Sequence, residues 1–147
     1  MTIDSLKICS IQKEHMPSVI KLLQSISEYN PLNSDLKKIW DLFEVQTNVF
    51  AFVAINDKNV LGYGSIVISR NIRGGKIGFI EDVVISKKYR NLGIGKKIIC
   101  TLEGVAHDHL CYKIVLQSTI NSTEFYQKLD FSRNSGLGMV KFMNFNN

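Results

Sequence analysis

The pattern of hydrophobic and polar residues predicts a strand followed by two helices in the first third of the chain. Residues 6–11 alternate between apolar and polar side chains, as a half-buried strand does. Two later groups of apolar residues recur at the spacing of one helix face. These groups are Val19, Leu22, Leu23 and Ile26, and then Leu36, Ile39, Trp40 and Phe43. Asn33 or Ser34 is expected to cap the second helix, because short polar side chains accept hydrogen bonds from free helical N–H groups.

The middle of the chain predicts three strands joined by short turns. Residues 49–55 and 60–68 are rich in β-branched and aromatic residues and flank a turn at 56–59. Gly74 and Gly75 mark the next turn, after which residues 76–85 return as a central strand. Short turns join antiparallel neighbours, so a mostly antiparallel sheet is expected.

The last third of the chain predicts a helix, a strand, a second helix and a final strand. Apolar residues recur at helical spacing from Ile98 to Ala106, and residues 112–116 have the pattern of a buried strand. Asn121 begins a sequence like a capping box, which predicts a helix through Leu129. The apolar tail Met139, Phe142, Met143 and Phe145 is expected to form the final strand.

Length and composition predict one compact domain. The chain has 147 residues, 45% of them hydrophobic, and contains only 2 prolines. We find neither a linker nor an internal repeat, so a single domain over residues 1–147 is expected. The start of the chain does not resemble a secretory signal, and no apolar run approaches membrane-spanning length. A cytoplasmic location without membrane association is therefore expected.

Charge favours an anionic partner, and the sequence gives no sign of a metal site. The formal net charge is +5, but the basic residues are dispersed and match no nucleic-acid recognition motif. A phosphorylated small molecule explains the charge equally well, although a basic nucleic-acid-binding domain remains an alternative. Neither the 3 cysteines nor the 3 histidines have metal-ligand spacing, so no metal is expected.

A basic, glycine-spaced loop follows the central strand and predicts an anion site. Arg90 opens this loop, and Gly93 and Gly95 let the backbone approach a ligand closely. The first N–H groups of the following helix have no helical partner, and therefore suit a diphosphate. The spacing matches neither the Walker motif nor the dinucleotide-binding fingerprint, so nucleoside triphosphates and nicotinamide cofactors are disfavoured.

The pattern Arg90-x-x-Gly93-x-Gly95 resembles the acyl-CoA loop of the GNAT acetyltransferase superfamily, and the order of predicted elements is that of the GNAT fold. The resemblance implies an α/β (α+β) fold with a mixed, mostly antiparallel sheet, helices on its faces, and splayed fourth and fifth strands. It also implies acetyl-CoA as donor and coenzyme A as product. Segments 80–84, 111–114 and 125–128 are similar in order and spacing to the glucosamine-6-phosphate N-acetyltransferase family.

In such a fold the pantetheine arm lies between the splayed strands, where the N–H of Val84 or a neighbour would polarise the thioester carbonyl. Asn121 matches a contact to coenzyme A, although an N-cap role would explain it equally well. By resemblance, the residues that contact acetyl-CoA are Val83, Val84, Ile85, Arg90, Asn91, Leu92, Gly93, Ile94, Gly95, Lys96, Asn121, Phe125, Tyr126 and Lys128.

Three residues are expected to be catalytic by the same resemblance. Tyr126 would protonate the departing thiolate, because a phenol is protonated at neutral pH; the alternative is that it only packs beside its neighbours. Asp82 would contact the sugar or its amine, and Glu81 would shape the pocket. Adjacent strand residues point to opposite faces, so only one of these two is expected to face the substrate. Gln117 stands where relatives carry an acidic residue; it can accept a hydrogen bond but cannot act as a base.

The acceptor site is expected to hold a phosphosugar. Candidate contacts are Ser27, Arg70, Arg73, Glu81, Asp82, Lys113, Gln117 and Lys141. The relatives carry an arginine near the end of the chain, and Phe142 stands at that position here. The resemblance therefore leaves open which residues bind the phosphate. Relatives exchange the final strand between subunits, so a homodimer is expected.

The expected reaction is acetylation of glucosamine 6-phosphate to N-acetylglucosamine 6-phosphate, a step toward UDP-N-acetylglucosamine. Two alternative functions are compatible with the same fold. One is acetylation of another amine, such as a peptide N-terminus or a polyamine, and the other is a non-catalytic acyl-CoA-binding module.

Overall fold

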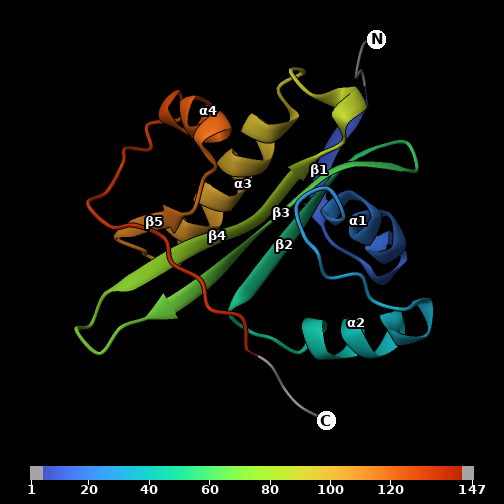
Figure 1. Cartoon of the computed structure of the whole chain (residues 1–147), viewed down its shortest axis with the longest axis horizontal. Helices are drawn as coiled ribbons and strands as arrows, with labels where there is room; N and C mark the ends of the chain where they lie inside the picture. The colour runs from blue at the N-terminus through green and yellow to red at the C-terminus, as the bar shows by residue number, and fades with distance from the viewer. Residues whose placement is uncertain (1–4, 144–147) are drawn as a thin grey trace. The chain divides into compact units, whose positions relative to one another are not determined.

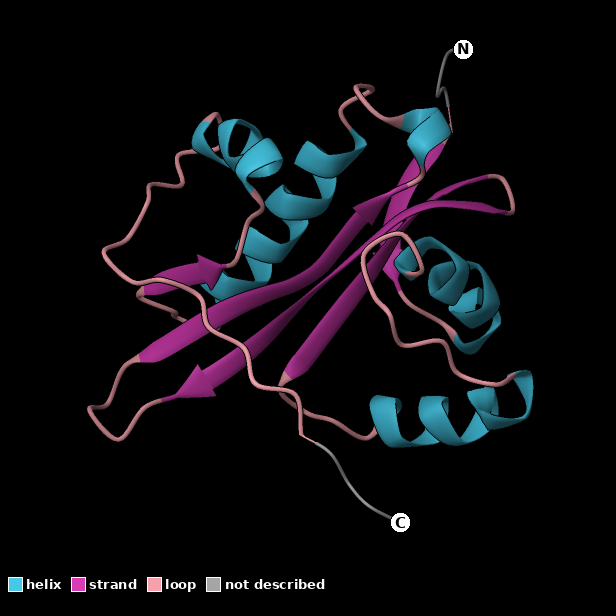
Figure 2. Ribbon diagram, in the orientation of Figure 1, coloured by secondary structure: helices cyan, strands magenta, loops and turns pink. Residues whose placement is uncertain are grey.

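The computed structural model describes residues 5–143, and the chain divides into two compact units, residues 1–116 and 117–147. The first unit holds a five-stranded sheet in the order β1-β2-β3-β4-β5 (Figures 1 and 2). The strands are β1 (Leu6–Ser10), β2 (Val49–Asn56), β3 (Asn59–Arg70), β4 (Lys76–Ile85) and β5 (Lys113–Leu116). A single domain over residues 1–147 stays a prediction.

The sheet is mixed and mostly antiparallel, as expected. Strands β1 to β4 pair antiparallel in sequence order, and β5 pairs parallel to β4. Helices α1 (Met16–Leu23) and α2 (Leu36–Glu44) lie on one side of the sheet, and α3 (Ile94–Asp108) lies on the other (Figure 1). The return from β4 to a parallel β5 therefore runs through α3, as a parallel pairing requires.

Two apolar layers hold the helices on the sheet. On the α1 and α2 side, Met16, Val19 and Trp40 pack with Val53 and Tyr63 in one buried cluster. Helix α3 contacts β3 and β4 and buries the side chains of Ile94, Ile98, Ile99 and Leu102. Because both faces are covered, residues 61–66 of β3 are buried without the alternation that a half-exposed strand shows.

The predicted starts and turns need small corrections. The turn between β2 and β3 spans only Asp57 and Lys58, because both strands extend further than expected, and Asp57 has a φ of 54°. Asn33 and Ser34 do not cap α2; they lie in a 3₁₀ turn (Asn33–Asp35), and the N-cap of α2 is Asp35.

The second unit contains the short helix α4 (Thr123–Gln127), which follows a 3₁₀ turn (Ile120–Ser122). Asn121 lies inside this turn and does not cap the helix, so that expectation was wrong. Hydroxyl groups satisfy the turn instead. Thr119 Oγ1 lies 2.8 Å from Ser122 Oγ, and Thr123 Oγ1 donates to the Thr119 carbonyl at 3.0 Å. These bonds join hydroxyl groups to one another and to a carbonyl oxygen, and no side chain of the described residues caps the N–H groups at the start of α4.

The predicted final strand is absent from residues 132–143, the part of the tail that is described, and Phe145 lies outside the described residues. Leu137, Met139 and Val140 are exposed instead of paired. A strand needs a neighbouring strand to satisfy its backbone, and none within residues 5–143 pairs with this segment. Across the described chain, none of the helices has the length and apolar character needed to cross a membrane.

Candidate active site

The acyl-CoA loop, residues 90–96, joins a 3₁₀ turn (Lys87–Tyr89) to the start of α3. Gly93 is the N-cap of α3 and has a φ of 79°, in the left-handed region that favours glycine. The N–H of Lys97 donates to the Gly93 carbonyl at 3.1 Å, which closes the first turn. The N–H groups of Ile94, Gly95 and Lys96 precede that bond, so they have no helical acceptor.

This loop has the features that a diphosphate group requires. A β-carbon built on Gly93 meets nothing within 4 Å, so the approach to the helix start is open. Ile94 is 1% exposed and anchors the loop in the core beneath. Arg90 and Lys96 are exposed, so both cations are free to approach a ligand. The structure therefore brings these predicted loop residues together at one helix start.

Arg90 is also held by the strand that precedes the loop. Its Nε donates to the carbonyl of Ile85, the last residue of β4, at 3.4 Å. The remaining guanidinium nitrogens stay available, because an arginine carries five N–H donors. This contact couples the orientation of Arg90 to the end of β4.

A bulge in β4 changes the expected directions of Glu81 and Asp82. Ser65 is opposite Glu81 and Tyr63 is opposite Val84, so two residues of β4 face Gly64 alone. Asp82 has a φ of 56°, which is uncommon for a residue with a side chain. The bulge breaks the alternation, and both carboxylates are exposed. The alternation on which that expectation rested is therefore absent here, and which of the two carboxylates faces the substrate stays a prediction.

Strand β5 pairs with only the first part of β4 (Figure 2). Its four residues are opposite Ile77–Ile80, and β4 then continues to Ile85. Within the described chain, no strand occupies that edge of β4 beyond Ile80. This is the opening expected between the fourth and fifth strands, and it borders Val83, Val84 and Ile85.

Three of the four cations predicted for the sugar phosphate lie near the other end of β4, namely Arg70, Arg73 and Lys113. Arg70 is opposite Lys76, and Lys113 is opposite Ile77. Asp82 follows Lys76 by six residues, which corresponds to about 20 Å along a strand. Arg73 lines a cavity of about 350 Å³ together with Tyr112, over whose ring Lys113 Nζ lies at 5.4 Å from the centroid. Within one copy of the chain, these cations therefore lie far from Asp82.

Sequence reasoning missed a second group of cations beside the end of β4. A cavity of about 380 Å³ is lined by Lys21 of α1, Lys58 of the β2–β3 turn and Lys87. Ser18, Ser25 and Ser86 add hydroxyl groups to the same wall, and none of its lining residues is acidic. The three lysines are far apart in the sequence, so only the basic pair Lys87–Lys88 was a visible signal.

Ser27 lies beyond the end of α1, in an exposed loop. Its Oγ accepts a hydrogen bond from the Tyr29 N–H at 3.1 Å. The side chain thus has a local structural role, and its predicted contact to the substrate stays a prediction.

In the second unit, Tyr126 packs between two aromatic rings. The ring centroids of Phe125 and Phe131 lie 5.0 Å and 5.8 Å from that of Tyr126, both edge-on. Burial raises the pKa of the Tyr126 phenol above its ordinary value. The phenol is therefore protonated at neutral pH, as a general acid must be.

Other predicted residues of this unit have local partners. Lys128 Nζ lies 2.9 Å from Glu124 Oε1 in an exposed i, i+4 pair. Gln117 lies so close to Gly138 that a β-carbon there would collide with its amide group. Asn121 and Lys141 are exposed. The catalytic and binding roles of these residues stay predictions.

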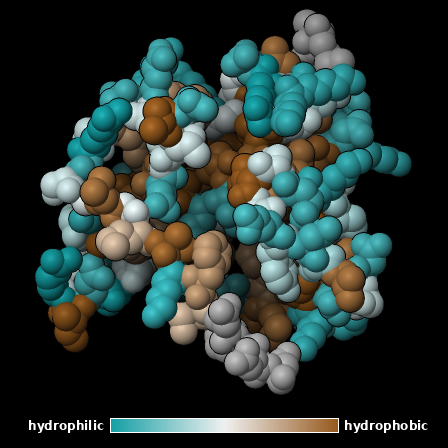
Figure 3. Space-filling model, in the orientation of Figure 1, coloured by the Kyte–Doolittle hydropathy of each residue, from teal (hydrophilic) through white to brown (hydrophobic). Residues whose placement is uncertain are grey.

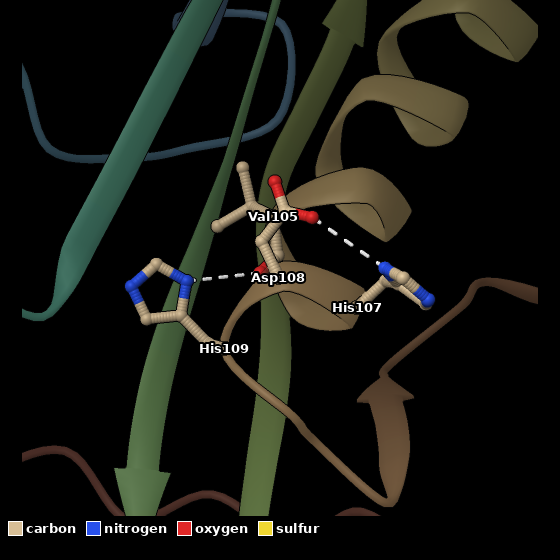
Figure 4. Close-up of polar contacts among 4 residues, drawn as sticks. All are labelled: Val105, His107, Asp108 and His109. Carbon is tan, nitrogen blue, oxygen red and sulfur yellow. Dashed lines mark hydrogen bonds and ion pairs between the residues drawn. The ribbon is translucent and has the colours of Figure 1, made fainter.

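Histidine side chains at the end of α3 have structural partners. His109 Nδ1 lies 3.0 Å from the Val105 carbonyl oxygen, and its ring packs on Phe50 with centroids 4.7 Å apart. His107 Nδ1 lies 3.4 Å from Asp108 Oδ1, and the two rings extend to different sides of the helix end (Figure 4). Among residues 5–143, no cluster of three or more His, Cys, Asp or Glu residues is arranged to hold a metal ion.

The fold and the glycine-spaced loop at the start of α3 are both features of one class of enzyme. The model of the Acetyltransferase (GNAT) family matches residues 16–131, so the chain belongs to the GNAT acetyltransferases. This confirms the expected family, the GNAT fold and acetyltransferase activity. GNAT acetyltransferases use acetyl-CoA, which confirms the expected donor.

Similarity to individual proteins narrows this class. A Trypanosoma brucei brucei protein named glucosamine 6-phosphate N-acetyltransferase is 33% identical over 132 residues, covering 86% of this chain and 88% of that protein. A crystal structure of a Trypanosoma brucei acetyltransferase superposes with a TM-score of 0.84 at 27% identity and covers 93% of this chain and 99% of the other.

The structure of glucosamine-6-phosphate N-acetyltransferase from Arabidopsis thaliana superposes with a TM-score of 0.86 at 22% identity. It covers 96% of this chain and 100% of the other, and at this identity it supports the fold alone.

Proposed function

We propose that this enzyme transfers the acetyl group of acetyl-CoA to the 2-amino group of glucosamine 6-phosphate. The observation that carries the proposal is the 33% identity to the trypanosome glucosamine 6-phosphate N-acetyltransferase, which extends over most of both chains. The product, N-acetylglucosamine 6-phosphate, is then available for synthesis of UDP-N-acetylglucosamine in the cytoplasm.

Binding of the donor is assigned to the acyl-CoA loop and the open edge of β4. The N–H groups at the start of α3, with Arg90 and Lys96, hold the diphosphate. The backbone of Val83–Ile85 hydrogen-bonds the pantetheine amides, and an N–H of this segment, at Val84 or a neighbour, polarises the thioester carbonyl. Acetyl-CoA supplies an activated acetyl group in thioester linkage.

Proton transfer is assigned to residues of this chain at both ends of the reaction. The amine must lose a proton when its nitrogen bonds to the acetyl carbon, and Asp82 is the proposed acceptor, directly or through water. Gln117 orients the amine through its amide oxygen. Tyr126 donates its phenolic proton to the sulfur as the carbon–sulfur bond breaks, so charge does not accumulate on the thiolate.

A homodimer is part of this proposal. The tail exposes Leu137 (92%), Met139 (94%) and Phe142 (78%), more apolar surface than an isolated terminal segment usually leaves in water. Apolar side chains also reach the surface elsewhere between hydrophilic ones (Figure 3). Pairing the tail with a second copy of the chain would bury these residues. It would also let a partner supply cations to the phosphate of the substrate. Within one copy, the predicted cations on β3 and β5 lie far along β4 from Asp82.

The test offers acetyl-CoA with glucosamine 6-phosphate, glucosamine, spermidine or a short peptide, and measures release of free thiol. Clear preference for the phosphosugar supports the proposal. Activity only with another amine would keep the acetyltransferase and overturn its substrate. If glucosamine is acetylated as well as its phosphate, recognition of the phosphate would be refuted.

A further inference from the structure

A pair of polar side chains lies buried beside the bulge of β4. Ser65 is 5% exposed and Tyr63 is 6% exposed. They are separated by one residue on β3, so both point to the same face of the sheet. Tyr63 lies in the apolar cluster with Val53, Trp40 and Val84. Buried polar groups in such a position must satisfy their hydrogen bonds within the protein.

The Ser65 hydroxyl bonds directly to β4. Ser65 Oγ donates to the carbonyl oxygen of Glu81 at 3.1 Å. Burial raises the pKa of the Tyr63 phenol to about 12, and the charges of Asp82 and Glu81 add smaller contributions in the same direction. The phenol is therefore protonated at neutral pH beside the bulge.

These contacts bracket the strained residue of the bulge. Ser65 is opposite Glu81, immediately before Asp82, and Tyr63 is opposite Val84, two residues after it. Asp82 has a φ of 56°, a conformation that persists only where the surroundings impose it. On the other face of β3, a β-carbon on Gly64 would come within 2.7 Å of the Ile98 side chain, so β3 packs tightly against α3 beside the bulge.

We propose that Ser65 is a positioning residue that fixes the bulge of β4, and thereby orients the Asp82 carboxylate toward the acceptor amine. The proposal rests on the role assigned to Asp82 under the proposed function. The Ser65 hydroxyl acts through the backbone at Glu81, to which it donates its hydrogen bond. Acetyl-CoA binding depends on the loop after β4 and is not expected to change.

Steady-state kinetics test this assignment. Ser65→Ala should lower kcat/KM for the acceptor amine by about tenfold, the effect of one lost hydrogen bond, with the KM for acetyl-CoA changed by less than about twofold. Ser65→Thr keeps the hydroxyl and should restore the activity. Tyr63→Phe keeps the aromatic ring and the bond from Ser65 to Glu81, so it should change both parameters by less than about twofold. Ser69→Ala, on the same strand and opposite Ile77, is the matched control and should leave both parameters unchanged.

A double-mutant cycle shows whether the effect passes through Asp82. If Ser65 acts by orienting that carboxylate, Ser65→Ala should cost little more once Asp82→Asn is present. An equal loss in both backgrounds, or a Ser65→Ala enzyme with wild-type kinetics, would overturn the proposal.

Hydrogen exchange tests the bulge without any substrate. In Ser65→Ala the amides of residues 81–85 should exchange at least about tenfold faster, whereas those of β2 should keep their wild-type rates. Unchanged exchange at the bulge would refute the positioning role. If the wild-type enzyme acetylates none of the four amines, the proposed function fails, and this measurement still decides the role of Ser65 in the bulge.

Discussion

Burial raises the pKa of Tyr63 and of Tyr126, although the two phenols lie in different units. For Tyr126 the consequence is chemical, because a phenol that keeps its proton can give it to a leaving thiolate. For Tyr63 the consequence concerns stability, because the phenol is buried in the apolar cluster and resists ionisation there. The sequence motif pointed to Tyr126, but nothing around Tyr63 distinguished it from an ordinary core aromatic residue.

Tyr63 predicts a dependence of stability on alkaline pH. Its pKa rises from an ordinary value of 10.0 to about 12 in the folded protein, so the folded state holds the proton more tightly. This stabilisation is complete below about pH 10 and is lost as pH rises through about 12, a change of about 3 kcal/mol in the free energy of unfolding.

Denaturant unfolding between pH 9 and 12 measures the effect. Tyr63→Phe should lose less stability than the wild type over this range, and subtraction of the two curves removes the contribution of the lysines. Tyr29→Phe changes an exposed tyrosine and serves as the control. Parallel curves for the wild type and Tyr63→Phe would contradict the prediction.

For Tyr126→Phe we predict a loss of turnover with little change in the affinity for acetyl-CoA. The substitution keeps the aromatic packing and removes only the proton, so kcat should fall by about a hundredfold or more while the KM for acetyl-CoA is nearly kept. Steady-state kinetics at neutral pH measure both quantities. A raised KM with unchanged kcat would assign Tyr126 to binding instead of acid catalysis.

At the scale of elements, the sequence predicted β4 with its bounds and most other elements nearly as they lie. Periodicity and glycine-marked turns carry that information locally. The bulge was not predictable, because Glu81 and Asp82 read as ordinary alternating positions and the extra residue becomes visible only against β3. The start of α4 was mispredicted because a 3₁₀ turn that includes Asn121 precedes the helix and moves its N-cap to Ser122.

The glycine that caps α3 and a glycine inside this helix predict opposite effects of the same substitution. Gly93→Ala places a side chain at a φ of 79°, which should cost about 1–2 kcal/mol of stability and raise the KM for acetyl-CoA by distorting the loop. Gly104→Ala adds a methyl group to an exposed helix position with nothing within 4 Å and should stabilise by up to about 1 kcal/mol.

Thermal unfolding and acetyl-CoA kinetics measured on the two variants check this pair. The melting temperature should fall for Gly93→Ala and rise for Gly104→Ala, and only the first should bind the donor more weakly. Equal affinity for acetyl-CoA in the two variants would show that Gly93 has no role in binding the donor.

At the scale of the whole molecule, the structure of the tail could not be predicted from the sequence of one chain. Its apolar residues predicted a strand, but a strand requires a partner whose identity the pattern does not contain. The same limit applies to the phosphate site: Arg70, Arg73 and Lys113 were named for their charge and their resemblance to relatives, and their distance along β4 from Asp82 emerged only from the register.

The proposed dimer predicts that charges in the tail separate the subunits. Met139→Asp combined with Phe142→Asp places carboxylates on surface that dimerisation would bury, so the mass in solution should fall from that of two chains to that of one. Light scattering at micromolar concentration measures this. Leu42→Asp, at an exposed position of α2, is the control. A wild-type monomer under these conditions would refute the dimer.

The short pairing of β5 with β4 also affects the stability of the enzyme when acetyl-CoA is absent. Beyond Ile80, β4 has an edge without a strand among the described residues, and such edges recruit strands of other molecules. A donor whose amides occupy this edge would both cap it and stabilise the folded state in proportion to the logarithm of its concentration. Cellular supplies of acetyl-CoA would then govern the aggregation and lifetime of the protein as well as its rate of catalysis.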